Sequence, residues 1–304
     1  MKIAFILLCH KNPKQINSLI SKLLLIDSEI FIHFDKKSYA LSSEIIENER
    51  VHILSFEESF SINWGGMGMI YATLQLMNKV LSAKENFEYI WLLSGQDYMI
   101  TSPQKIYNFL KLNDKFNYID IIEKNDDKYN RYKKLYELWY PTWINKNNFF
   151  VKIIKRLYMI ITGGYYRTFN IFVRKRNFNQ DFYFGSQWWT LTTNCCEYIV
   201  KYCKDNPEYI KYFKNTIIPD ECFFQTIFMN SEFKNYRKEN LTFVNWKENS
   251  RSPSILKESD FELIERKSEN FCFARKFDQD VDNRIFNKIN DILLNSDELG
   301  DYYE

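Results

Sequence analysis

Short apolar runs alternate with amphipathic stretches through the first hundred residues. Residues 2–9 form a continuous apolar run, which is typical of a strand buried on both faces of a parallel sheet. Asn12 and Pro13 then supply a helix cap and a first-turn proline, so we expect an amphipathic helix to about residue 25. Further strands are expected at 29–33, 51–54 and 88–93, and helices at 42–47, at 68–83 and after Ser102. This alternation predicts an α/β fold with a doubly wound parallel sheet.

The periodic pattern weakens between about residues 125 and 179, which are rich in Lys, Arg, Tyr, Phe and Asn. An amphipathic stretch covers 149–161 within it. We interpret this segment as a variable basic and aromatic insertion with surface helices. A second interpretation is a lobe that rests on an anionic membrane or holds an acceptor, and a third is contact with single-stranded nucleic acid.

Regular patterning returns after the insertion. We expect a strand up to residue 191, a helix over 195–204, a strand over 241–246 and a C-terminal helix over 281–294. No internal repeat or low-complexity linker divides the chain. Residues 1–304 are therefore predicted to form a single domain, large enough for an enzyme, with the insertion inside it.

Composition narrows the classes of function. Hydrophobic residues make up 45% of the chain and aromatic residues 18%, while the net charge is only +2. A nearly neutral chain is a poor polyanion binder, so we expect no nucleic-acid partner. The six cysteines form no Cys-x-x-Cys pair, and no run resembles a signal peptide or a membrane span. We therefore expect a cytoplasmic protein with buried thiols, with peripheral contact at the inner face of the membrane as an extension of this prediction.

Three polar residues are predicted at the same edge of the sheet. His10, Asp35 and Asp97 each follow an expected strand, and ligands of open α/β sheets bind outside the carboxyl ends of their strands. Each residue alone is more often a structural turn residue. Three at one edge favour a binding site.

The stretch at Pro219, Asp220 and Glu221 has two interpretations. The preceding residues 217–218 are expected to be extended because they stand before a proline. Proline at the first position then suits a helix whose opening turn holds both acids, where they complement the helix dipole. Alternatively, a carboxylate beside Phe223 and Phe224 loses hydration and becomes a general base. The stretch by itself favours the first interpretation.

The motifs that commonly hold phosphates are missing from the sequence. There is no Gly-x-x-x-x-Gly-Lys loop and no Gly-x-Gly-x-x-Gly turn. The turn that would carry the paired acids of a metal-dependent sugar transferase has one acid, Asp97, and one carboxylate is a weak magnesium or manganese ligand set. Arg275 and Lys276 offer two positive charges for a diphosphate instead, although the two residues by themselves favour a solvated strand end.

Several segments together carry a resemblance to a known family. In chain order they begin with Ile3-Ala4-Phe5-Ile6-Leu7 and His10, and continue with Ile32-His33-Phe34-Asp35-Lys36-Lys37-Ser38, Trp64-Gly65-Gly66, Ser94-Gly95-Gln96-Asp97-Tyr98-Met99-Ile100, Gly185-Ser186-Gln187-Trp188, Ile218-Pro219-Asp220-Glu221-Cys222-Phe223-Phe224 and Phe273-Ala274-Arg275-Lys276-Phe277-Asp278. In order and spacing this set resembles glycosyltransferase family 14, which holds core-2/I-branching β-1,6-N-acetylglucosaminyltransferases and peptide O-xylosyltransferases. The segment 125–179 is not covered.

The resemblance implies a GT-A type fold with a Rossmann-like mixed central sheet flanked by helices. It also implies an inverting transfer from a UDP-sugar and no required metal or other cofactor. It assigns Glu221 as the catalytic base and Arg275 with Lys276 as the pair that holds the diphosphate. Its other implied nucleotide-sugar contacts are His10, Asp35, Lys37, Trp64, Asp97 and Arg251.

The acceptor side is predicted to include Gln187, Trp188 and Trp189. Gln187 stands where the xylosyltransferases of the family have an acid, so GlcNAc and xylose both remain candidate donor sugars. Composition suggests a bacterial enzyme that builds surface polysaccharide or lipooligosaccharide on a glycan or glycolipid acceptor. The alternative is a non-catalytic carbohydrate-binding or membrane-surface scaffold protein that retains the fold.

Overall fold

The computed structural model describes residues 1–137, 149–162, 180–247, 250 and 252–294. Its N-terminal part alternates strand and helix, as the apolar runs predict. The elements are β1 (Ile3–Cys9), α1 (Pro13–Leu23), β2 (Ser28–Phe34), the 3₁₀ segment η1 (Lys36–Glu44), β3 (Val51–Ile53), α2 (Gly68–Leu81) and β4 (Tyr89–Ser94).

The remaining elements are shorter and less regular. They are β5 (Asp97–Met99), α3 (Pro103–Leu112), β6 (Asn117–Ile119), α4 (Asp127–Glu137), α5 (Phe149–Thr162), β7 (Trp189–Thr192), α7 (Thr193–Asp205), α8 (Pro207–Phe213), η3 (Pro219–Glu221), α9 (Phe223–Met229), η4 (Glu232–Tyr236), β8 (Arg237–Lys238), β9 (Thr242–Val244), η5 (Glu258–Asp260), α10 (Phe261–Lys267), β10 (Phe273–Arg275), α11 (Arg284–Ile289) and the π-helical turn η6 (Asn290–Leu294).

In the described part of the chain, seven strands form a large sheet in the order β3-β2-β1-β4-β7-β6-β8. Strands β1 to β4 pair in parallel, whereas β7 runs antiparallel to both β4 and β6. A small sheet in the order β5-β10-β9 lies beside it. The sheet is therefore mixed, which confirms the α/β class and the mixed central sheet implied by the resemblance. The wholly parallel sheet expected from the alternation holds only for β1 to β4, because β7 inserts antiparallel beside β4.

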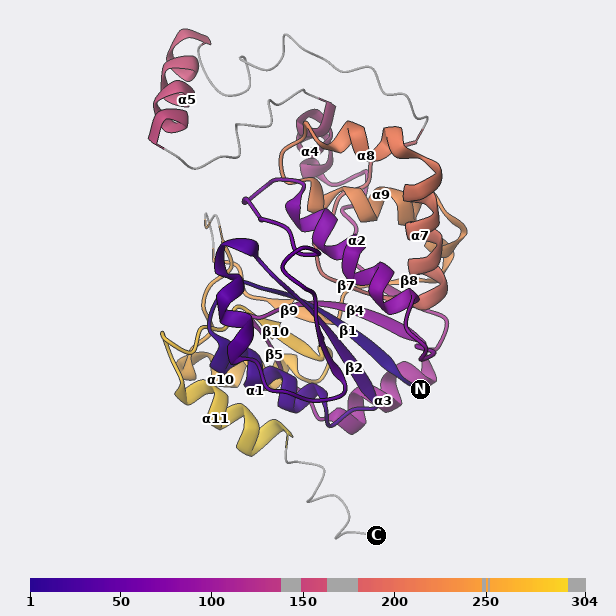
Figure 1. Ribbon diagram of the computed structural model, residues 1–304, viewed down its shortest axis with the longest axis vertical. Helices are drawn as coiled ribbons and strands as arrows, with labels where there is room; N and C mark the ends of the chain where they lie inside the picture. The colour runs from indigo at the N-terminus through magenta and orange to yellow at the C-terminus, as the bar shows by residue number, and fades with distance from the viewer. Residues whose placement is uncertain (138–148, 163–179, 248–249, 251, 295–304) are drawn as a thin grey trace.

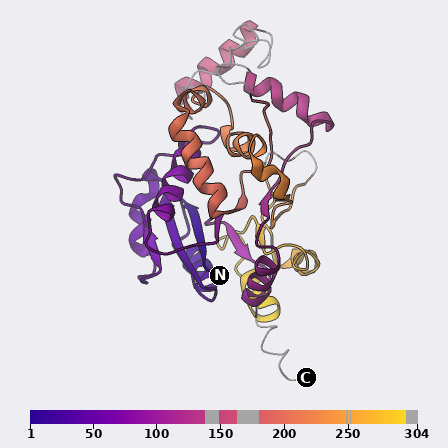
Figure 2. The same ribbon diagram turned by 90° about the vertical axis from the view of Figure 1, so that its right-hand side faces the viewer.

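Helices cover both faces of the large sheet (Figure 1). Ile3, Phe5 and Leu7 of β1 face a core shared with α1, α3, α10 and α11. The alternate side chains Ala4 and Ile6 face a second core with α2, α7 and α9. Figure 2 shows the N-terminal elements on one side of the molecule and the yellow C-terminal elements on the other. A strand buried on both faces needs a continuous apolar run, which is what β1 has.

Two local predictions around the acidic stretch are wrong. Ile218 was expected to be extended, but it is left-handed, with φ 52° and ψ 51°. The single helix expected from Pro219 is split at Cys222, whose φ of −137° separates the 3₁₀ turn η3 from α9. No side chain caps the start of η3. The two acids therefore occupy a separate turn and do not open α9.

The start of the predicted insertion belongs to the core. Tyr129 and Tyr136 of α4 are buried in the same apolar cluster as α7 and α9. The described part of α5, by contrast, lies apart from the sheet and its covering helices (Figure 1). A peripheral insertion beginning at about 125 is thus incorrect for α4.

All six cysteines are free and buried, as expected. Burial raises the pKa of each of the thiols Cys195, Cys196 and Cys203 above its ordinary value. Among the described residues, no helix has the length and apolarity needed to cross a bilayer.

Candidate active site

The site lies where β1, β2 and β4 end. His10 follows β1 and is exposed, whereas Asp35 follows β2 and is buried. The Asp35 N–H donates to the carbonyl of Cys9 over 2.9 Å, and its carboxylate accepts from the N–H of Lys37 over 3.0 Å. The parallel register thus brings the residues after β1 and β2 together at one edge.

Charged residues from both ends of the chain affect the pKa of His10. Partial desolvation of its ring lowers its pKa, and the cations Lys11 and Lys276 lower it further, while Asp35 acts in the opposite direction. A neutral imidazole can both donate and accept a hydrogen bond. His10 therefore suits a polar ligand at this edge.

Lys37 connects this edge to the loop before α2. Its Nζ donates to the carbonyl of Ile62 and, over 3.1 Å, to the side-chain oxygen of Asn63. It also lies 3.8 Å from Asp35 Oδ2. Trp64, which follows Asn63, is 78% exposed, so its indole is open to solvent in the loop that Lys37 contacts.

Asp97 has a supporting position. Its side chain is fully buried and accepts hydrogen bonds from the N–H and hydroxyl of Ser94, over 2.9 and 3.2 Å. Antiparallel pairing of β5 with β10 places it directly opposite Arg275, with 3.5 Å between Asp97 Oδ1 and Arg275 Nε. Burial raises the pKa of Asp97, and Arg275 opposes that rise. The predicted direct contact of Asp97 with the donor is wrong for this geometry, because the carboxylate is fully enclosed and pairs with Arg275.

Arg275 is a buried cation with unused donors. Its guanidinium carbon lies 4.0 Å from the centre of the Trp188 ring, a cation–π contact. Within the described residues, neither Nε nor Nη1 makes a hydrogen bond, because the contact with Asp97 is too poorly aligned. Burial lowers the pKa of Arg275, and Asp97 raises it. Buried donors without acceptors are rare and costly, so these atoms fit an anionic oxygen.

Lys276 and Lys11 add positive charge next to Arg275. Burial lowers the pKa of Lys276, with further lowering by Arg275 and Lys11. Lys11 forms an ion pair with Asp278 in which Nζ and Oδ2 are 2.5 Å apart, and Asn12 donates to the other carboxylate oxygen over 2.9 Å. Lys11, Asn12 and Asp278 were not predicted as site residues. Asn12 was predicted as a helix cap, which is wrong, because its side chain makes no cap hydrogen bond and donates to Asp278. Their places in the sequence could have indicated them, because Lys11 and Asn12 directly follow His10 and Asp278 is two residues after Lys276.

The turn η3 presents two carboxyl groups of unusual basicity. Burial raises the pKa of Glu221 to about 7, and the neighbouring Asp220 adds to the rise. Burial also raises the pKa of Asp220 to about 6. In the described chain, Glu221 forms no ion pair with Lys276 or any other cation. A carboxylate with a pKa near neutrality is suited to general base catalysis.

The segment from Gly185 to Trp188 connects this turn to the cations. The Gly185 N–H donates to the Glu221 carbonyl over 2.9 Å, and the Gln225 side chain donates to the Ser186 carbonyl over 2.7 Å. Trp188 then lies against Arg275. Three residues of extended chain span at most about 10 Å, so the residues that contact the Glu221 backbone and Arg275 lie close together in the fold.

Gly185 has to be glycine for this approach. A Cβ there would lie 1.8 Å from the carbonyl oxygen of Asp120. The segment is therefore pressed against the backbone that follows β6.

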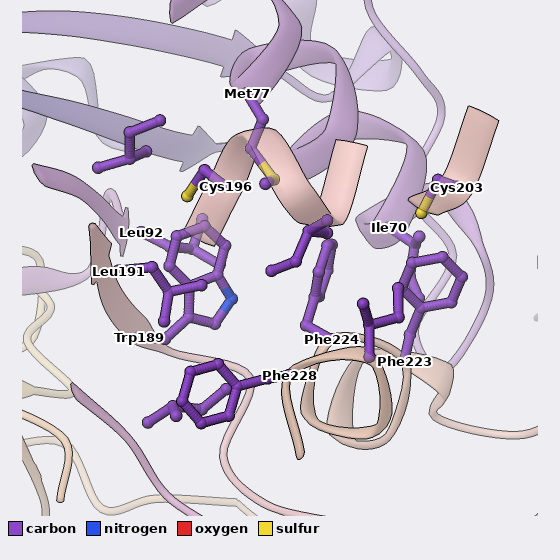
Figure 3. Close-up of a cluster of buried hydrophobic side chains, with 14 of the residues drawn as sticks. Ile70, Met77, Leu92, Trp189, Leu191, Cys196, Cys203, Phe223, Phe224 and Phe228 are labelled. Carbon is purple, nitrogen blue, oxygen red and sulfur yellow. The ribbon is translucent and has the colours of Figure 1, made fainter. Parts of the chain in front are cut away.

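The three predicted acceptor residues have different environments. Gln187 is buried, and its Nε2 has no hydrogen-bond partner within the described residues. Trp188 is buried under Arg275. Trp189 is 0% exposed and packs against Phe224 with 5.8 Å between ring centres, deep in the second core (Figure 3). An acceptor contact for Trp189 is therefore wrong, because its ring has no exposed surface.

Two further predictions concern Arg251 and the metal site. Arg251 lies outside the described residues. Across the ranges that are described, no three His, Cys, Asp or Glu side chains gather as a metal-ligand set.

Comparison with known proteins gives a family match over most of the chain. A family model described as Core-2/I-Branching enzyme matches residues 3–266. Xylosyltransferase oxt of Drosophila pseudoobscura pseudoobscura is 22% identical over 315 residues, which cover 96% of this chain and 33% of that protein. Xylosyltransferase 1 of Rattus norvegicus is 23% identical over 322 residues, which cover 99% of this chain and 36% of that protein. The chain thus spans about a third of the length of the curated relatives it matches.

Solved structures give a weaker likeness. The apo form of mouse Xyloside xylosyltransferase 1 is similar over 90% of this chain and 97% of that chain, with a TM-score of 0.38 and 11% identity.

Proposed function

Because the chain belongs to the Core-2/I-Branching enzyme family, we propose that it is an inverting glycosyltransferase that moves a sugar from a UDP-sugar to a hydroxyl group of a glycan acceptor. The match confirms the family resemblance expected from the sequence motifs. One observation carries the proposal: buried Arg275 has unused donors beside Lys276, and the 185–188 segment separates these cations from the basic carboxyl of Glu221.

The proposed reaction is a single in-line displacement. Glu221 accepts the proton of the acceptor hydroxyl while that oxygen forms a bond to the anomeric carbon of the donor. The bond from this carbon to the diphosphate oxygen breaks, and UDP leaves with the electron pair. Arg275 and Lys276 stabilise the negative charge that develops on the diphosphate. The separation of Glu221 from these cations supports the proposal, because an ion pair with them would lower the basicity of Glu221.

On the donor side, His10 and Asp35 are proposed to bind the uridine, with Lys37 and Trp64 beside them. These side chains come from loops at the carboxyl ends of the strands, where nucleotides bind in open α/β sheets. Asp97 is proposed to act indirectly by holding Arg275. GlcNAc and xylose are the proposed donor sugars, and the xylosyltransferase names of the relatives support the second.

Charge neutralisation by Arg275 and Lys276 supports a reaction that needs no divalent metal. A planar guanidinium can bind two phosphate oxygens at once, and an ammonium adds a compact charge. We propose that this pair takes the place of the metal ion that a paired-acid site would hold. UDP release should then proceed equally with and without EDTA.

The test measures UDP release from UDP-GlcNAc, UDP-xylose, UDP-glucose, UDP-galactose and UDP-glucuronate, with glycan and glycolipid extracts as acceptors. One donor should support turnover, and Glu221→Gln should lower kcat by about 10²–10⁴-fold. Glu197→Gln is the matched control, because Glu197 is an exposed glutamate of α7. Full activity of Glu221→Gln would refute the assignment of the base. No release from any donor would favour the carbohydrate-binding alternative.

We also propose that the acceptor is linked to an anionic membrane and that α5 rests on its surface. Phe149 and Phe150 are 72% and 75% exposed, and Ile153, Ile154 and Leu157 lie exposed on the same side of the helix. The sequence of α5 holds basic residues, including exposed Lys152 and Arg156, and no acid. An apolar stripe flanked only by cations complements an anionic bilayer surface. Synthesis of a bacterial surface glycan is the setting we propose for such an acceptor.

Flotation with vesicles of phosphatidylglycerol and phosphatidylcholine tests this contact. The protein should float with anionic vesicles and not with pure phosphatidylcholine, and binding should weaken as salt rises. The double variant Phe149→Ser/Phe150→Ser should stay at the bottom of the gradient. Equal flotation of this variant, or concentration-dependent dimerisation without vesicle binding, would contradict the membrane proposal.

A further inference from the structure

The turn that carries Glu221 begins at a residue with an unfavourable backbone. Ile218 has φ 52° and ψ 51°, the left-handed region that costs an L-residue energy because Cβ approaches a carbonyl oxygen. It is β-branched, and it also precedes Pro219, which favours an extended conformation. Local sequence preferences therefore oppose the conformation that leads into the turn.

Two hydrogen bonds from distant segments hold Ile218 in place. Its N–H donates to the carbonyl of Gly65 over 3.0 Å. Its carbonyl accepts from the hydroxyl of Tyr136 over 2.5 Å. Gly65 is itself left-handed, with φ 70°, and follows the exposed Trp64. Each backbone polar group of Ile218 thus has a partner from a distant segment, the N–H in the loop at Trp64 and Gly65 and the carbonyl in α4. The carbonyl also accepts from the N–H of Glu221 over 3.2 Å within the turn, so the residue that Tyr136 holds is bonded directly to Glu221.

Tyr136 is rigidly placed to make this bond. Its side chain is 1% exposed, and its ring stacks on Phe184 with 5.1 Å between ring centres. The carbonyl of Tyr136 accepts from the hydroxyl of Tyr212 over 2.7 Å. Burial raises the pKa of Tyr136 well above its ordinary value, so its hydroxyl remains a donor throughout the working pH range.

We infer that Tyr136 is a positioning residue: its hydroxyl holds Ile218 left-handed and thereby aims the Glu221 carboxyl at the acceptor. This inference rests on the proposed transfer reaction. The Ile218 N–H donates to the carbonyl of Gly65. The position of Glu221 is therefore also coupled to the loop that holds Trp64 and Gly65, on the proposed donor side. The site residues predicted from the sequence do not include Tyr136.

Tyr136→Phe isolates the hydroxyl, because the ring and its packing stay. We expect kcat to fall about tenfold, the loss that corresponds to one hydrogen bond, while KM for the donor stays within about twofold. The midpoint of the kcat/KM pH profile should move below about 7, since a relaxed turn exposes Glu221 to water. Tyr129→Phe is the matched control, because Tyr129 is also buried on α4 and donates to the carbonyl of Phe182 over 2.9 Å; its kcat should stay within about twofold.

A second substitution separates positioning from general destabilisation. Glycine adopts the left-handed conformation freely, so Ile218→Gly should restore most of the kcat that Tyr136→Phe loses. Hydrogen exchange of a peptide covering residues 217–224 should be faster in Tyr136→Phe and should return toward the wild-type rate in the double variant. This measurement needs no turnover, so it reports on Ile218 even if the proposed reaction is wrong.

Each result of these experiments either supports or overturns the positioning role of Tyr136. Equal loss of kcat in Tyr136→Phe and Tyr129→Phe, or no recovery with Ile218→Gly, would overturn the positioning role. Unchanged exchange of the 217–224 peptide in Tyr136→Phe would overturn it as well. If Tyr136→Phe speeds this exchange but the wild type turns over no donor, the role of Tyr136 in holding Ile218 would be supported. Only the proposed transfer reaction would then be refuted.

Discussion

Replacing Glu221 with glutamine should stabilise the fold at alkaline pH while it removes the proposed base. Burial raises the pKa of this carboxyl from 4.5 to about 7, with an added contribution from Asp220. The folded state then binds more protons than the unfolded chain between these pH values. The stabilising contribution of Glu221 is therefore complete below about pH 4.5 and is lost as the pH rises through about 7.

The size of the effect follows from the shift in pKa. One pKa unit corresponds to about 1.4 kcal/mol, so the shift of Glu221 corresponds to roughly 3 kcal/mol once the carboxylate is ionised. Glu221 keeps partial contact with solvent, which screens its charge. We therefore expect Glu221→Gln to unfold with a free energy about 1–3 kcal/mol higher than the wild type at about pH 8.

Urea unfolding followed by tryptophan fluorescence measures this difference. At about pH 4 the carboxyl is protonated in the folded protein and largely protonated in the unfolded chain. A neutral carboxyl and an amide are similar in size and polarity, so the two proteins should then differ by less than about 0.5 kcal/mol. Glu197→Gln makes the same chemical change at an exposed position of α7 and should show no pH-dependent difference. An equal difference between variant and wild type at both pH values would refute the desolvation of Glu221.

Three further outcomes test the packing around the site. Gly185→Ala should lower the thermal midpoint by several degrees, because its Cβ would lie 1.8 Å from the Asp120 carbonyl oxygen; an unchanged midpoint in a thermal melt would contradict this contact. Trp189→Ala should cost about 3–5 kcal/mol in urea unfolding, whereas Trp64→Ala, at an exposed position, should cost less than about 0.5 kcal/mol. Burial lowers the pKa of His33 from 6.5 to about 4, so wild-type stability should fall as pH drops through this window; an equal acid slope in His33→Asn would argue against His33 as the cause.

The central strands were predictable because their signal is local. Strands β1, β2 and β4 are buried along their whole length, and each contains a run of at least three consecutive hydrophobic residues that marks it directly. Their ends also locate His10 and Asp35 at one edge without further information. The helix α1 likewise starts at Pro13, where the sequence predicts it.

Other features depend on contacts that no local pattern contains. Trp188 and Trp189 are neighbours of the same type and both are buried, but Trp189 pairs with Leu92 of β4 and packs on Phe224 whereas Trp188 contacts Arg275. The left-handed Ile218 depends on partners in the Trp64 loop and α4. The pairing of Arg275 with Asp97 similarly depends on the register of β10 against β5.

Tyr136 is an intermediate case. With Tyr129 and Tyr132 it follows the spacing of one helix face, so a buried helix at this point was detectable. The charged residues around these tyrosines obscured that signal.

The ion pair between Lys11 and Asp278 joins residues separated by 267 positions in the chain. A ribosome that adds about 5–20 residues per second needs roughly 15–50 s to cover that interval. During this time the first strands can already pair, but β10 and its two cations do not yet exist. The ion pair and the neighbouring cations Arg275 and Lys276 are therefore expected to join this edge of the sheet only after residue 278 has been synthesised, well after the first strands can pair.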